Sequence, residues 1–79
     1  MVYNINRAQK VLEKVRYDMP FGEKLRELRG DKTQEEIARE VGVTKSSWAM
    51  YERNERVPRD EVKIRIANYF HKSVQEIFF

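Results

Sequence analysis

The sequence predicts an all-α fold in which residues 20–79 form one five-helix domain and residues 1–19 add a helical N-terminal segment. Apolar residues recur every three or four positions along most of the chain, as they do on the buried face of a helix. Strand-like alternation is limited to Val62–Ile66, and this run continues into ANYF, which favours a longer helix. Pro20 and Pro58 fall between predicted helices and separate them.

The first predicted helix spans residues 4–16 and is amphipathic, with basic side chains away from its apolar stripe. Asn4 is a suitable N-cap, because its side chain can accept a hydrogen bond from the first turn. The residue before Pro20 resists the helical conformation, so this helix ends before it. The stripe consists of Ile5, Ala8, Leu12 and Val15.

The second predicted helix follows Pro20 and ends at Gly30. The third begins after Thr33, where Thr33 and Glu36 have the spacing of a capping box, and ends after about two turns at Gly42. The apolar faces of these two helices consist of Phe21, Leu25 and Leu28, and of Ile37, Ala38 and Val41.

The fourth predicted helix, Thr44–Arg53, turns Trp48 and Tyr51 toward the core. Asn54 ends it, because asparagine tolerates the left-handed backbone conformation. A fifth helix follows Pro58 at residues 59–70, and Ser73 caps a last short helix at residues 74–78.

Two helices of about two turns each are not stable alone, so the third and fourth must share one core. Gly42 permits the sharp corner between them, and this pairing predicts a helix-turn-helix unit. The outer face of the fourth helix is free of acidic residues before Glu52, as expected for a helix that enters a DNA groove. That outer face consists of Lys45, Ser46, Ala49 and Met50.

Composition narrows the function classes. Sixteen Lys and Arg against thirteen Asp and Glu give a net charge of +3, which permits nucleic acid as a partner without requiring it. No nucleophile–base pair, carboxylate dyad or glycine-rich phosphate loop is visible, so we expect no enzyme activity and no cofactor. One histidine and no cysteine argue against a metal site. No apolar run approaches the ~20 residues of a membrane span, so we expect a cytoplasmic protein without membrane contact.

The run from Phe21 to Phe79 resembles the phage repressor/Cro-type helix-turn-helix domain. The matching pieces are GEKLRELR, TQEEIAREVGVTKSS, YER-N, VP and SVQEIFF, and together they cover about three quarters of the chain. The tail is similar to that of small prophage regulators of Gram-positive bacteria. The sequence departs from the family pattern at Trp48, Asn54, Glu55 and His71, where isoleucine or valine, glycine, lysine and glycine are usual.

The resemblance implies roles for individual residues. Lys45, Ser46, Ala49 and Met50 match positions that reach base edges in the major groove. Arg26 and Glu52 match a structural ion pair, although Arg29 is a rival partner for Glu52. Without the resemblance, Lys45 and Ser46 would be interpreted as ordinary surface residues, and Met50 as a residue that only fills space. The positions near DNA phosphates are Thr33, Gln34, Ser47, Arg53 and Arg56.

The resemblance therefore implies a sequence-specific regulator of transcription, most simply a repressor, that binds double-stranded DNA. One domain contacts a half-site, so we expect a homodimer on an operator with two-fold symmetry. The apolar end Ile77, Phe78 and Phe79 is the first candidate dimer surface. The rival is a protein-interaction module such as an antitoxin or an anti-regulator. For residues 1–19 three roles remain open: a helix packed on the domain or a second subunit, a basic arm on DNA, or a helix docked on a protein partner.

Overall fold

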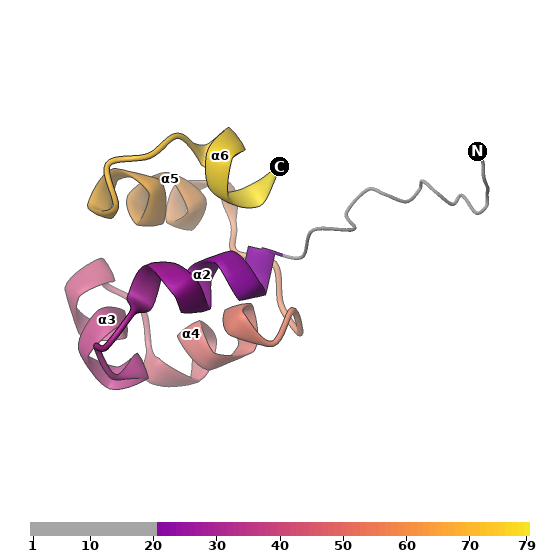
Figure 1. Cartoon of the computed structure of the whole chain (residues 1–79). Coiled ribbons are helices and arrows are strands. Elements are labelled where there is room, and N and C mark those ends of the chain that lie inside the picture. The colour runs from indigo at the N-terminus through magenta and orange to yellow at the C-terminus, as the bar shows by residue number, and fades with distance from the viewer. Residues whose placement is uncertain (1–20) are drawn as a thin grey trace.

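The computed structural model describes residues 21–79, so the helix predicted at residues 4–16 lies outside the described residues. Within this range five α-helices and no strand are present, which confirms the all-α prediction (Figure 1). None of the helices in residues 21–79 is long and apolar enough to cross a membrane. The helices are α2 (Phe21–Arg29), α3 (Gln34–Val41), α4 (Lys45–Glu52), α5 (Asp60–Tyr69) and α6 (Val74–Phe78).

Helix α2 lies through the middle of the fold, with α3 and α4 on one side and α5 and α6 on the other (Figure 1). Trp48, Leu25 and Ile66 are fully buried at the centre and come from three different helices. Because each helix is short, its stability depends on this shared apolar contact rather than on its own hydrogen bonds. The remaining core residues are Ile37, Ala38, Val41, Tyr51, Val62, Ala67 and Ile77.

The helix starts are those that the sequence predicts. The Thr33 hydroxyl accepts a hydrogen bond from the Glu36 N–H at 3.0 Å, and the Glu36 carboxylate accepts one from the Thr33 N–H at 2.9 Å. A second capping box, which the sequence analysis missed, joins Ser73 and Glu76 at the start of α6. Each box satisfies backbone donors that the first helical turn leaves without partners.

The α4 end is joined to the α2 start. Asn54 has a φ of 60°, as predicted, and its Oδ1 accepts a hydrogen bond from the Gly22 N–H at 3.0 Å. A Cβ atom on Gly22 would lie 2.3 Å from the main-chain oxygen of Glu52. Glycine at this position therefore permits the close approach of α2 and α4, and the Asn54 side chain joins the end of α4 to the start of α2.

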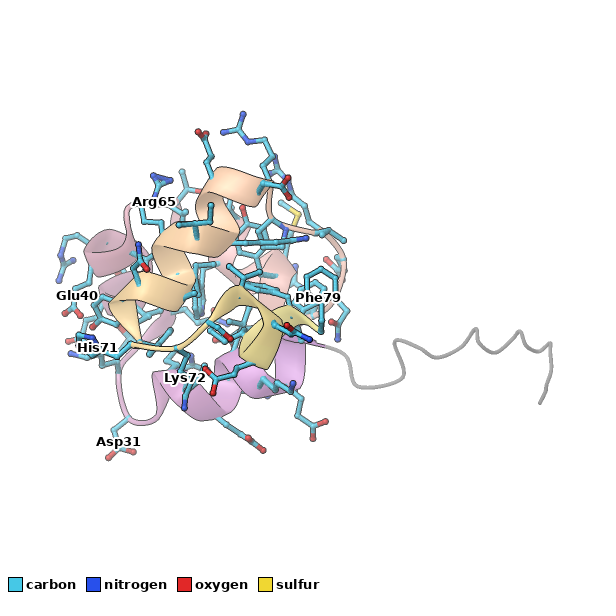
Figure 2. The ribbon with its side chains drawn as sticks, turned by 90° about the horizontal axis from the view of Figure 1, so that it is seen from above. Asp31, Glu40, Arg65, His71, Lys72 and Phe79 are labelled. Atoms are coloured by element: carbon cyan, nitrogen blue, oxygen red, sulfur yellow. The ribbon has the colours of Figure 1, made fainter. Side chains whose placement is uncertain are left out.

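One prediction about the C-terminus is wrong. Ile77 is 1% exposed and belongs to the core of the monomer, so it is not available as a dimer surface. Phe78 is half-buried and packs on Phe21, with 5.5 Å between ring centroids. Phe79 alone of the three is freely exposed, and it lies at the end of the chain (Figure 2). A five-residue helix must turn one side inward to remain attached, and Ile77 lies on that side.

Candidate nucleic-acid interface

The corner between α3 and α4 is a tight left-handed turn at Gly42. Gly42 has a φ of 94°, and its N–H and that of Val43 both donate to the Ala38 carbonyl, at 2.8 and 2.9 Å. Both donors meet the same carbonyl in the last turn of α3, and the helix ends at Gly42. Thr44 then caps α4 by accepting a hydrogen bond from the Ser47 N–H at 3.0 Å. The predicted helix-turn-helix unit is therefore present.

The outer face of α4 is open where the sequence predicts it. Trp48 and Tyr51 are buried behind the helix, at 0% and 4% exposure. Lys45 and Ser46 are exposed in the first turn, which contains no acidic residue. The other two predicted base-contacting residues, Ala49 and Met50, are half-buried. The most accessible part of this face is thus its N-terminal end.

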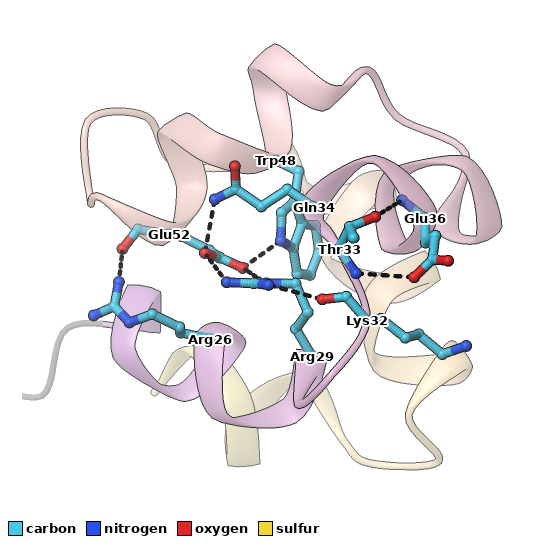
Figure 3. Close-up of polar contacts among 8 residues, drawn as sticks. All are labelled: Arg26, Arg29, Lys32, Thr33, Gln34, Glu36, Trp48 and Glu52. Carbon is cyan, nitrogen blue, oxygen red and sulfur yellow. Dashed lines mark hydrogen bonds and ion pairs between the residues drawn. The ribbon is translucent and has the colours of Figure 1, made fainter.

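Glu52 is a buried carboxylate that joins α2, α3 and α4 (Figure 3). Arg29 donates to it from Nε at 2.6 Å and from Nη2 at 3.2 Å. Gln34 donates from Nε2 at 3.0 Å, and the Trp48 indole N–H also donates. The carboxylate thus accepts four hydrogen bonds, and these make its buried charge tolerable.

The predicted ion pair between Arg26 and Glu52 is wrong. Arg26 instead donates from Nη1 to the main-chain carbonyl of Glu52, at 3.3 Å, and Arg29 is the partner of the carboxylate. Arg26 is exposed, whereas Arg29, one turn later on α2, is half-buried beside the carboxylate. The Glu52 carboxylate lies beside Arg29, while its main-chain carbonyl lies near Gly22 and Arg26, closer to the start of α2.

The same contacts set the charge state of Glu52. Burial alone raises the pKa of this carboxyl, but hydrogen bonds from Arg29, Gln34 and Trp48 favour the ionised form and outweigh burial. The net result is a pKa below the ordinary value, so Glu52 is ionised at neutral pH. The indole donor is a feature that the sequence analysis did not anticipate. Its signal was the i, i+4 spacing of Trp48 and Glu52 on one helix.

The predicted phosphate-contacting residues are unequally available. The Thr33 hydroxyl is occupied in its capping box, and Gln34, at the start of α3, is held by Glu52. Arg53 is paired with Glu55 at 2.9 Å, both side chains being more than half exposed. Each partner shifts the pKa of the other, upward for Arg53 and downward for Glu55. Ser47 is half-buried and Arg56 is exposed.

A surface hollow of ≈ 200 Å³ lies between α4, the following loop and α5. Three arginines and three hydroxyl-bearing side chains line it, and no acidic residue does; we call it the arginine hollow. Arg59 and Arg65 belong to it together with the predicted Arg56, and sequence reasoning missed both of them. Its lining consists of Gly42, Val43, Thr44, Ser47, Tyr51, Arg56, Arg59, Val62 and Arg65.

A separate polar cluster joins α3 to α5 outside this interface. Glu40 accepts hydrogen bonds from the Tyr69 hydroxyl and from Lys32 Nζ, the latter at 3.3 Å. The Tyr69 hydrogen bond and the Lys32 contact lower the pKa of Glu40. In the described part of the chain no cluster of three or more His, Asp or Glu side chains is placed to hold a metal ion.

Comparison with known proteins agrees with this geometry. The profile of the helix-turn-helix family matches residues 23–77, which is more than half of the chain. Searches of curated proteins and of solved structures gave no match. The matched range includes α3, the Gly42 turn, α4 and the core that holds them. The chain therefore belongs to the helix-turn-helix family of DNA-binding transcriptional regulators, with a lambda-repressor-like fold.

Proposed function

We propose that this protein is a sequence-specific repressor that binds double-stranded DNA as a homodimer, with α4 in the major groove. The observation that carries the proposal is the exposure of Lys45 and Ser46 on the first turn of a helix whose opposite side is fixed by Trp48. A lysine ammonium can donate to guanine O6 and N7, and a serine hydroxyl can pair with several bases. Ala49 and Met50 would add apolar contact to thymine methyl groups deeper in the groove.

Backbone contacts would come from both ends of the unit. Gln34 stands at the α3 N-terminus, where backbone N–H groups and the helix dipole favour an anion. Arg56 extends from the loop after α4 and approaches the backbone from the other side of α4. Arg53 contributes less than an unpaired arginine would, because its guanidinium already meets Glu55. Specificity therefore rests on α4, and orientation on the two flanking backbone contacts.

The homodimer places two copies of α4 about 34 Å apart on an operator with two-fold symmetry. With Ile77 in the core, the candidate dimer surface is reduced to Phe79 and the exposed part of Phe78. Lys63 lies over both rings, at 5.8 Å from the centroid of Phe78 and 5.1 Å from that of Phe79. A prophage origin and a regulatory partner for residues 1–19 stay predictions.

The test is selection of bound duplexes from a random pool, followed by fluorescence anisotropy with the selected sequence. Lys45→Ala should change which sequence is preferred, because a base contact is lost. Gln34→Ala should weaken binding to all duplexes alike. Lys72→Ala and Gln75→Ala, matched exposed residues near α6, should change neither. Unchanged preference and affinity in both site variants would refute the assignment, and absence of duplex binding by the full chain at low salt would refute the function.

A further inference from the structure

Arg65 belongs to α5, outside the helix-turn-helix unit, yet it lies beside the corner of that unit. A Cβ atom on Gly42 would be 3.8 Å from Arg65 Nε and 3.9 Å from its Cζ. These are ordinary van der Waals distances, so the guanidinium lies next to the turn. Arg65 extends outward from α5, on the side of the fold away from Phe79 (Figure 2). The turn therefore brings an α5 residue next to the start of α4.

No ion pair within residues 21–79 accounts for this position. Arg65 is exposed, and among residues 21–79 no ion pair occupies its guanidinium. Arg59 by contrast is paired with Glu61, at 3.2 Å, although both side chains are largely in solvent. Thr44 and Ser47 add hydroxyl groups to the same hollow. An arginine without an ion-pair partner among the described residues, close to two other arginines, points to an external anion.

The chemistry of the hollow fits a phosphate group. Guanidinium groups present a planar fork of N–H donors that matches phosphate oxygens, and two hydroxyls can complete the set. Bringing Arg56, Arg59 and Arg65 to one hollow raises their mutual repulsion, and a bound anion relieves it. A hollow open to solvent admits a group on a polymer as readily as a free ion.

We propose that Arg65 binds a DNA backbone phosphate in the arginine hollow, so that α5 supplies a contact in addition to those of the helix-turn-helix unit. This inference rests on the proposed function, because it takes the duplex to be the source of the phosphate. It extends the protein surface on DNA beyond α4 and its loop. The contact carries no sequence information and increases affinity for every duplex.

The variant that tests this is Arg65→Gln, with Arg39→Gln as the control. Arg39 is also an exposed arginine, on α3, so both variants lower the net charge equally. For Arg65→Gln we expect binding to specific and random duplexes to weaken by the same factor, roughly 3- to 10-fold, and the slope of log K against log salt to fall by about 0.9. Arg65→Lys should keep most of the slope, and Arg39→Gln all of it. Thermal unfolding of Arg65→Gln should match that of the wild type.

The outcomes separate the inference from the function on which it rests. If the wild type binds duplexes and Arg65→Gln has the same salt slope as the wild type, Arg65 does not contact phosphate. If the wild type binds no duplex, the proposed function fails, and titration with inorganic phosphate decides the site alone. In that titration, the amide NMR signals of Gly42 and Ser47 would shift and saturate with added phosphate. Loss of these shifts in Arg65→Gln would support a site for free phosphate. Absence of such shifts in a chain that binds no duplex would overturn the site altogether.

Discussion

Replacing Glu52 by alanine should destabilise the fold more than any exposed substitution on α4. The change leaves the buried Trp48 indole N–H without an acceptor, which costs about 1–3 kcal/mol. It also leaves Arg29 without its carboxylate, and breaking a buried ion pair costs about 3–5 kcal/mol in all. Arg29 is 19% exposed and recovers some hydration, so we expect a total near 3 kcal/mol, the lower end of about 3–5 kcal/mol. A 79-residue chain has only about 4–12 kcal/mol of stability to lose.

Urea unfolding followed by circular dichroism measures this loss directly. Glu55→Ala is the matched control, because it removes a carboxylate from an exposed pair with Arg53 and should cost less than about 1 kcal/mol. Equal unfolding midpoints for the two variants would show that the contacts of Glu52 with Arg29, Gln34 and Trp48 do not stabilise the fold.

Two further predictions concern the same junction of α2 and α4. The pKa of Glu52 is lowered in the folded chain, so its contribution to stability is full above the unfolded pKa and is lost as pH falls through the folded pKa. Acid titration of the unfolding free energy should show this loss below about pH 4.5, and Glu52→Gln should flatten that part of the curve. Gly22→Ala should destabilise by about 1–3 kcal/mol or more, because its Cβ meets the Glu52 carbonyl at 2.3 Å. A Cβ atom on Gly30 would meet no atom within 4 Å, so Gly30→Ala should cost only about 1 kcal/mol, which comes from the φ of 61°. Equal chemical-denaturation midpoints for the two alanine variants would contradict the close approach of α2 and α4 at Gly22.

The helix order was predictable because its signals are local. Thr33, Thr44 and Ser73 each precede an apolar helical pattern, and each caps a helix in the structure. Gly42 and Asn54 adopt the left-handed conformations that their positions require. Such signals depend only on neighbouring residues, so a single sequence contains them.

The Glu52 partner and the C-terminal surface were not predictable in the same way. Arg26 and Arg29 lie one turn apart on α2, and only the angle between α2 and α4 decides which of them reaches the carboxylate. Likewise the spacing of Ile77, Phe78 and Phe79 does not say which side of a five-residue helix faces the core. Arg65 lies in the arginine hollow because α5 packs on α3. That contact joins segments distant in sequence, so it could not be predicted from neighbouring residues.

The contacts of Glu52 with Arg29, Gln34 and Trp48 would also link stability to the proposed DNA contact, because Gln34 is the one of these residues at the proposed phosphate face. Its Nε2 is held by Glu52, so the amide is oriented before DNA arrives. If Glu52 acts on binding through Gln34, then Glu52→Gln should weaken duplex binding by the folded protein, and adding Gln34→Ala should weaken it little further. The double-mutant cycle, measured by anisotropy at a urea concentration where all four proteins stay folded, isolates this coupling. Losses of affinity that simply add would mean that Glu52 holds the helices together without positioning the glutamine.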